Sequence, residues 1–124
     1  MKIVDEALLE SFRKRGRCDV CGRLCDRREP HHLLGKGAGG GGRMDVRENL
    51  LSLGATQPFP RCPCHDLCQS RKIALKEQCA IVARREGLSS GQVVLERLWE
   101  LRRLPKGSKL PELPVGETAR GPPS

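Results

Sequence analysis

Apolar side chains recur at helical spacing near the start of the chain. Val4, Leu8 and Phe12 fall on one stripe, with Ala7 beside it. Basic residues fill the last turn of this segment and Gly16 follows, which is typical of a helix end. The pattern predicts an amphipathic N-terminal helix within residues 1–16.

Helical spacing returns between residues 65 and 86. Leu75, Cys79 and Val82 share one stripe, and Gly87 provides a stop. We therefore expect one helical segment over this range. Because it lies on the apolar stripe, Cys79 is predicted to be a core residue.

A last helix is predicted before Pro105, which cannot continue it. Ser89, followed three residues later by Gln92, resembles a capping box that opens this helix. Its apolar stripe consists of Val94, Leu98 and Leu101. We expect this stripe to pack on the core rather than on a second subunit.

The middle of the chain is not helical in pattern. Residues 17–30 are polar and rich in turn formers, and residues 31–34 and 49–53 are predicted to be two short strands. Between these strands, residues 35–42 hold six of the fourteen glycines, a density that no regular element tolerates. The predicted class is a single α+β domain over residues 17–104, with the N-terminal helix before it and a disordered tail over residues 105–124.

Composition indicates a small core that needs reinforcement. Only 37% of the 124 residues are hydrophobic and three are aromatic, whereas seven are cysteines. The first sixteen residues carry acidic side chains and do not resemble a secretory signal, so a cytoplasmic location is expected. In a reducing compartment, cysteines at short spacing point to a metal rather than to disulfides.

The charge balance favours a polyanionic partner. There are 23 Lys and Arg against 15 Asp and Glu, which gives a formal net charge of +8. The shortage of aromatic side chains argues for phosphate contacts rather than base stacking. No stretch approaches the roughly 20 apolar residues of a membrane span.

Several motifs occur in a characteristic order. Cys18 and Cys21 form a C-x2-C pair, and they are followed by PHHLLGKGAGGGGR over residues 30–43, ENLLSL over residues 48–53, and Cys64 directly before His65. This order resembles the HNH endonuclease family over roughly residues 17–72. The paired histidines with their glycine-rich loop are especially similar to small HNH proteins of bacteriophages and prophages.

The resemblance implies a ββα-metal unit that holds one catalytic divalent ion. His32 would be the general base, and His31 and His65 would be metal ligands. Asn49 would either orient the base and the loop or add a ligand. DNA phosphates are predicted to contact the basic residues Lys36, Arg43 and Arg47.

The chain departs from the family pattern at one active-site position. Relatives often carry another histidine four residues after the last motif histidine, and here that residue is Gln69. An amide is a poorer ligand for zinc, so Mg²⁺ or Mn²⁺ is expected as the catalytic ion. A weakened or inactive enzyme stays open as an alternative.

The cysteines fit a structural zinc site with four tetrahedral ligands. Cys18 and Cys21 supply two of them, and Cys64 is expected to be the third because it precedes His65. Cys62 is the predicted fourth ligand, with Cys68 as its alternative.

The predicted function is metal-dependent hydrolysis of DNA phosphodiester bonds, by nicking or by full cleavage. By analogy with phage HNH proteins, a partnership with packaging or recombination machinery is expected in a bacterial or phage-infected cell, and a homodimer is compatible with the sequence. Two alternatives stay open: a zinc-knuckle module that binds nucleic acid without catalysis, and a structural or adaptor protein folded by zinc.

Overall fold

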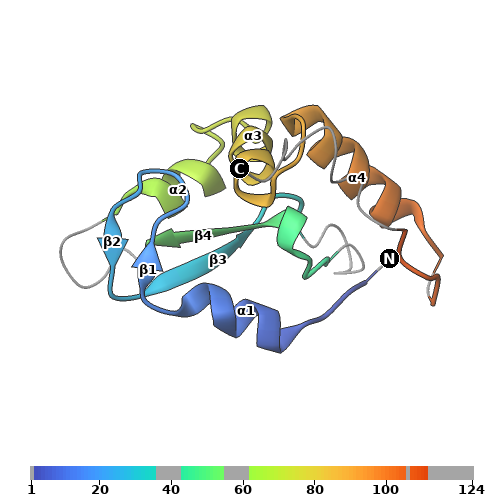
Figure 1. Ribbon diagram of the computed structural model, residues 1–124, viewed down its shortest axis with the longest axis horizontal. Coiled ribbons are helices and arrows are strands. Elements are labelled where there is room, and N and C mark those ends of the chain that lie inside the picture. The colour runs from blue at the N-terminus through green and yellow to red at the C-terminus, as the bar shows by residue number, and fades with distance from the viewer. Residues whose placement is uncertain (1, 36–42, 55–61, 106, 112–124) are drawn as a thin grey trace, which may run out of the picture.

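The computed structural model describes residues 2–35, 43–54, 62–105 and 107–111. These residues form four α-helices, a short 3-10 turn and two small antiparallel sheets, an arrangement compatible with the predicted α+β class (Figure 1). In chain order the elements are α1 (Glu6–Arg13), β1 (Gly16–Arg17), β2 (Leu24–Cys25), β3 (Arg28–His32), η2 (Arg47–Asn49), β4 (Leu50–Gly54), α2 (Cys64–Gln69), α3 (Leu75–Glu86) and α4 (Gly91–Arg103).

The β3–β4 sheet lies between helices on its two faces (Figure 1). On one face, Leu9 and Phe12 of α1 form a small apolar cluster with Leu50 of β4. On the other face, α2, α3 and α4 enclose the main core, which includes the fully buried Leu51 and Leu53. A short sheet can be buried in this way because successive side chains leave opposite faces of a strand.

Strand β3 is regular up to its last residue. It pairs antiparallel with β4, and the register places His31 opposite Leu51 and His32 opposite Leu50. The strand begins three residues earlier than predicted and ends at His32, so Leu33 and Leu34 follow it as buried core residues.

Helix α1 is shorter than its sequence pattern predicted. It begins after Asp5, whose carboxylate accepts a hydrogen bond from the Leu8 amide at 3.0 Å, as an N-cap residue does. Val4, predicted to join the apolar stripe, precedes the helix and is 51% exposed. The buried face is formed by Leu9 and Phe12 instead.

The prediction of one helical segment over residues 65–86 is wrong. The chain forms α2 and α3, separated by residues 70–74, and Arg71 has a left-handed φ of 63°. The Gln78 amide nitrogen donates hydrogen bonds to the carbonyl oxygens of Cys68 (3.0 Å) and Ile73 (2.8 Å). A buried side chain therefore satisfies the backbone groups that the break releases, which periodicity alone does not reveal.

The last helix packs on the core as its stripe predicted. Val94, Leu98 and Leu101 have no exposed area. The capping residue is Ser90 rather than Ser89, because the Ser90 hydroxyl accepts the hydrogen bond from the Val93 amide at 3.3 Å.

The segment between α1 and β3 contains an element that was not predicted. Strands β1 and β2 form a two-stranded hairpin around Cys18 and Cys21. Most of the predicted tail, residues 106 and 112–124, lies outside the described residues. Within the described ranges, no helix has the length and apolar character needed to cross a membrane.

Candidate metal centre and histidine pocket

Four cysteine side chains meet where the β1–β2 hairpin contacts the start of α2. The Sγ atoms of Cys18, Cys21, Cys62 and Cys64 all lie within 4.8 Å of one another. Two come from the hairpin turn, one precedes α2 and one is its first residue, and these are the four cysteines that the sequence predicted. Among the described residues this is the one group of three or more His, Cys, Asp or Glu side chains that converges in this way.

The sulfur spacing fits a tetrahedral zinc ion. The Cys62 Sγ lies 3.5 Å from the Cys18 Sγ and 3.7 Å from the Cys21 Sγ. A Zn–S bond of about 2.3 Å with tetrahedral angles sets neighbouring sulfurs roughly 3.8 Å apart. The four side chains could therefore hold a metal ion such as zinc with little rearrangement.

The surroundings of the thiols also suit a cation. Burial raises the pKa of Cys62 to about 11 and raises that of Cys64 further. Burial also acts to raise the pKa of Cys18, but hydrogen bonds from the backbone amides of Cys21, Gly54 and Val20 outweigh it and lower that pKa. A divalent cation would deprotonate buried thiols of this kind, since its charge offsets their desolvation.

Glycine at position 54 allows the close packing around this cluster. A Cβ atom there would lie 2.6 Å from both the Cys25 Sγ and the Cys62 Cβ. Cys68, the alternative fourth ligand, is fully buried in the core and does not belong to the cysteine cluster. Cys79 is also a core residue, as predicted.

The histidines border a separate pocket of about 350 Å³ between β3 and α2. His31 and His32 lie at the end of β3, and His65 lies on α2 with its ring centroid 5.9 Å from that of His31. Gln69, one helical turn after His65, and Arg71 also line this histidine pocket. The structure thus brings the three histidines together although β3 directs neighbouring side chains to opposite faces.

Gln78 of α3 determines which nitrogen of His31 carries a proton. The Gln78 amide nitrogen already donates to two carbonyl oxygens, so the Gln78 Oε1 is the atom that faces the His31 Nε2 at 2.9 Å. Because this oxygen only accepts, the His31 Nε2 must be the donor. Burial and the nearby charges of His65 and Arg71 lower the pKa of His31 despite this bond. The ring is therefore neutral at pH 7, and Nδ1 holds its free lone pair.

His32 is held in the same way by a carboxylate. The His32 Nε2 lies 2.8 Å from the Oδ1 of Asp45, whose side chain has no exposed area. Burial acts to raise the pKa of Asp45, but hydrogen bonds from Arg43, the Asp5 amide and His32 outweigh it and lower the pKa to about 2. An ionised carboxylate only accepts hydrogen bonds, so the His32 Nε2 donates and its Nδ1 is left as the basic atom.

Asn49 is fully buried and connects the two ends of the glycine-rich loop. Its Oδ1 accepts a hydrogen bond from the Leu34 amide at 2.9 Å. Its Nδ2 donates to the carbonyl oxygens of Leu34 (3.1 Å) and Met44 (3.0 Å). The oxygen and the nitrogen of the Asn49 amide are thus both hydrogen-bonded to backbone groups, on the two sides of the loop.

The predicted phosphate contacts have different surroundings. The Arg43 guanidinium donates to Asp45 at 2.8 Å and to Glu6 at 3.1 Å, so two carboxylates already engage it. The Arg47 side chain is half exposed and donates to Glu86 at 2.8 and 3.0 Å. Lys36 lies outside the described residues.

Three residues of this site were missed in the sequence: Asp45, Arg71 and Gln78. Gln78 left a usable signal, because a polar side chain at position 78 interrupts the apolar face formed by Leu75, Cys79 and Val82. Asp45 and Arg71 left none, since their proximity to the histidines depends on how the loop and the α2–α3 break are folded.

Comparison of the chain with protein-family models finds no match. Comparisons with curated proteins and with solved structures find none either. A functional inference therefore depends on the residues and on their geometry.

Proposed function

We propose that this protein is a metal-dependent HNH-type endonuclease that hydrolyses DNA phosphodiester bonds. The observation that carries the proposal is the His32–Asp45 hydrogen bond at the edge of a pocket that also holds His31 and His65. Strands β3 and β4 followed by α2 would form the ββα unit, and the cysteine cluster would bind its structural zinc.

His32 would act as the general base. With Nε2 donating to Asp45, Nδ1 is left to accept a proton from the attacking water. The charge of the ionised Asp45 would stabilise the imidazolium that forms, as the carboxylate of a catalytic triad does. Arg43 and the Asp5 amide hold this carboxylate in place.

His31 and His65 would hold the catalytic ion, with Gln69 and substrate oxygens completing its shell. Two imidazoles are a small set of protein ligands, which suits Mg²⁺ or Mn²⁺ because these ions keep several waters and bind substrate phosphate directly. When bound, the ion would stabilise charge on the scissile phosphate and on the leaving oxygen. The Gln78 hydrogen bond leaves the His31 Nδ1 as the nitrogen available to it.

Arg71 would assist at the phosphate. It lies in the α2–α3 break and has a positive φ. From there its side chain lines the histidine pocket and donates to the Leu33 carbonyl at 3.3 Å. A guanidinium at this point matches the charge of a phosphodiester. Arg47 and Lys36 stay predicted contacts to flanking phosphates.

A supercoiled-plasmid assay tests the proposal. Zinc-loaded protein is incubated with Mg²⁺, Mn²⁺ or EDTA, and His32→Ala, purified in the same way, controls for contaminating nucleases. We expect nicking that requires a metal and that falls by a factor of about 10²–10⁴ in the variant, the usual contribution of a general base. Equal nicking by both proteins would reject His32 as the base.

A binding module without catalysis is the second candidate. Gln69 in place of a third imidazole favours this candidate. If His32 is the base, His31 and His65 are the two imidazoles left to bind a metal among the described residues of the pocket. Folded, zinc-loaded protein that binds DNA but cleaves none with any metal would support this alternative.

A further inference from the structure

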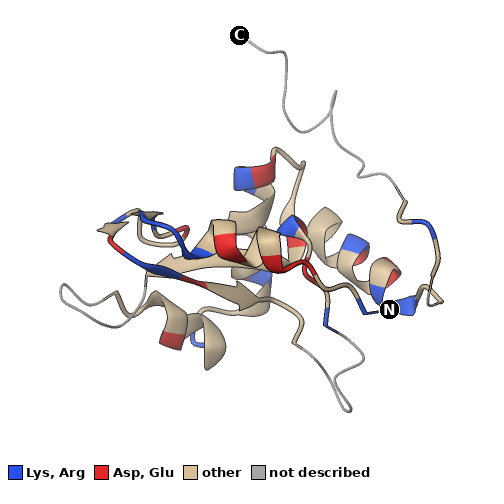
Figure 2. Ribbon diagram, turned by 90° about the horizontal axis from the view of Figure 1, so that it is seen from below, with Lys and Arg blue, Asp and Glu red and all other residues tan. Residues whose placement is uncertain are grey.

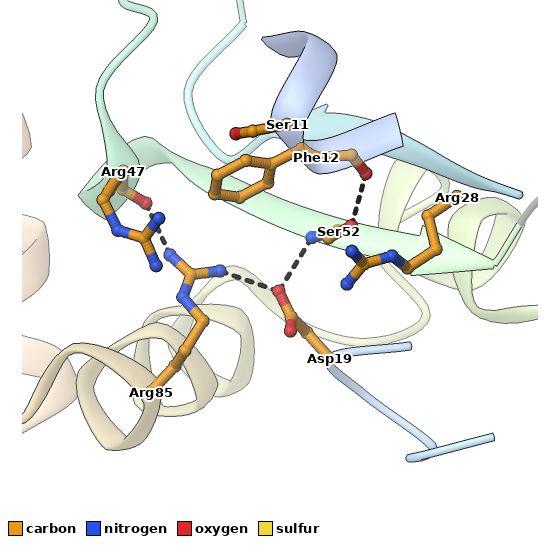
Figure 3. A pocket seen from close by; sticks show the side chains of 7 residues that line it. All are labelled: Ser11, Phe12, Asp19, Arg28, Arg47, Ser52 and Arg85. Carbon is orange, nitrogen blue, oxygen red and sulfur yellow. Dashed lines mark hydrogen bonds and ion pairs between the residues drawn. The ribbon is translucent and has the colours of Figure 1, made fainter. Parts of the chain in front are cut away.

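A second pocket lies on the opposite side of the sheet from α2, between α1, β3 and α3. It has a volume of about 220 Å³ and is lined by Arg28, Arg47 and Arg85, which come from β3, η2 and α3 (Figure 3). We propose that this arginine pocket binds a phosphodiester group of a nucleic-acid backbone. The identity of that nucleic acid as DNA rests on the proposed function, whereas the phosphodiester chemistry does not.

Arg28 is held in position without an acidic partner. Its Nε donates to the Lys14 carbonyl at 2.7 Å and its Nη1 to the Arg17 carbonyl at 3.1 Å. Gly16 makes room for it, because a Cβ atom there would lie 2.6 Å from the Arg28 guanidinium carbon. Across the described ranges no carboxylate forms an ion pair with Arg28, so its charge is not neutralised.

The other two arginines pack against an aromatic ring and are also held by ion pairs. The guanidinium carbons of Arg47 and Arg85 lie 5.4 and 5.3 Å from the centroid of the Phe12 ring. Figure 3 shows them on one side of the pocket and Arg28 on the other, with its guanidinium directed inward. Rigid guanidinium groups lose little conformational entropy when they bind an oxyanion.

The charges in and around the pocket favour a monoanion. Arg85 contacts Asp19 at 2.7 Å, and Arg47 contacts Glu86 at 2.8 Å. Three guanidinium groups against these two carboxylates leave one positive charge, which is that of Arg28. A phosphodiester carries one negative charge and matches this excess, whereas a free phosphate dianion would lie near the Asp19 carboxylate without full compensation.

The location suits a backbone that also reaches His32 at the edge of the histidine pocket. Arg28 and His32 are four residues apart on β3 and therefore leave the same face of the strand, about 13 Å apart along it. Figure 2 shows further Lys and Arg positions on the segment from α1 into the β1–β2 hairpin. A nucleic-acid strand along this side would meet these basic residues next to the arginine pocket.

The test compares Arg28→Gln with Arg27→Gln in the full, zinc-loaded chain. Arg27 is adjacent, its side chain is 66% exposed, and its replacement changes the net charge equally. Binding of a short labelled DNA duplex is measured over a range of salt concentrations. For Arg28→Gln we expect an affinity loss of about tenfold and a salt slope reduced by about 1, and for Arg27→Gln a loss of less than about threefold.

Anion titrations of the wild type identify the source of the phosphate group. The Arg28 Nε–H resonance is followed by NMR while dimethyl phosphate or inorganic phosphate is added, and Arg28→Lys shows whether charge without the planar fork suffices. A shift with dimethyl phosphate supports the proposal. Equal DNA affinities of the two Gln variants, or a shift with inorganic phosphate alone, would overturn it.

Neither the binding measurement nor the NMR titration requires the protein to cleave DNA. Protein that never nicks a plasmid but shows both effects would refute the proposed nuclease and leave the arginine pocket supported. Conversely, metal-dependent nicking with no effect of Arg28→Gln on binding would refute only the pocket.

Discussion

The ring nitrogens of His31 and His32 illustrate how single hydrogen bonds decide chemistry. Each ring donates its Nε2 proton to a buried acceptor, the Gln78 amide oxygen in one case and the Asp45 carboxylate in the other. Each therefore keeps its lone pair on Nδ1. Two adjacent residues acquire a defined tautomer from partners 47 and 13 positions away in sequence.

Replacing Asp45 by Asn should reverse the tautomer of His32. In the wild type the Asp45 Oδ2 accepts from the Asp5 amide at 2.9 Å and from Arg43 at 2.8 Å, so an asparagine would place its oxygen there. Its NH₂ group would then face the His32 Nε2. This nitrogen would have to accept a hydrogen bond, so the ring proton would lie on Nδ1 instead. We expect the plasmid nicking rate to fall by a factor of about 10²–10⁴, with DNA affinity nearly unchanged.

Glu6→Gln is the matched control for this change. Glu6 is the other carboxylate bound by Arg43, at 3.1 Å, and the structure gives it no contact with His32. Its loss should leave the nicking rate within about twofold of the wild type, as expected of an exposed ion pair. ¹⁵N NMR of the histidine rings reads the tautomer directly, and an unchanged Nε2–H form in Asp45→Asn would contradict the mechanism.

Among the elements, α4 depends on one buried ion pair as well as on its apolar stripe. Arg97 of α4 donates to Glu48 of η2 at 3.2 Å, and the two side chains are 8% and 6% exposed. The pair connects the last helix to the turn that precedes β4. Since η2 also carries Asn49, α4 reinforces the segment that closes the glycine-rich loop.

Arg97→Met should lower the free energy of unfolding by about 3 kcal/mol, because it leaves the Glu48 carboxylate buried without a partner. Changing Glu48→Leu in addition should recover most of this loss, since an apolar pair removes the unpaired charge. Chemical denaturation of the zinc-loaded proteins measures both values.

Arg103→Met provides the comparison within the same helix. Arg103 is exposed and should change the unfolding free energy by less than about 0.5 kcal/mol. If the double variant with Arg97→Met and Glu48→Leu is no more stable than Arg97→Met alone, the unpaired Glu48 carboxylate does not destabilise the protein and the explanation is wrong.

For the whole molecule, the cysteine cluster joins two parts of the chain that lie far apart in sequence. It links the β1–β2 hairpin to the start of α2, and hence to the strand-and-helix unit that carries the histidines. The binding free energy of a structural zinc is on the order of 10 kcal/mol. That is comparable with the entire unfolding free energy of a small domain, about 5–15 kcal/mol.

Removing zinc should therefore unfold the protein. We expect one zinc per chain, and we expect a strong chelator at neutral pH to abolish the cooperative thermal transition seen by circular dichroism. Cys62→Ala should lose the zinc. Cys68→Ala, which removes an equally buried thiol outside the cluster, should keep it and lose only about 1 kcal/mol of stability. Zinc retained by Cys62→Ala and lost by Cys68→Ala would reassign the fourth ligand.

The sequence by itself determined the features that depend on local spacing. The stripe of Val94, Leu98 and Leu101 predicted a last helix packed on the core, and the paired cysteines around position 18 and before His65 predicted the metal cluster. Short strands at β3 and β4 were also predicted, to within a few residues at their ends. Local patterns suffice here because a helix face, a strand or a C-x2-C turn is defined within a few residues.

Tertiary structure alone decided the rest. The break between α2 and α3 depends on a buried amide that receives backbone carbonyls, and the capping residue of α4 depends on backbone geometry. The partner of His32 lies across the glycine-rich loop, and the arginine pocket collects residues from β3, η2 and α3. These arrangements arise from contacts between segments far apart in sequence, which no local pattern encodes.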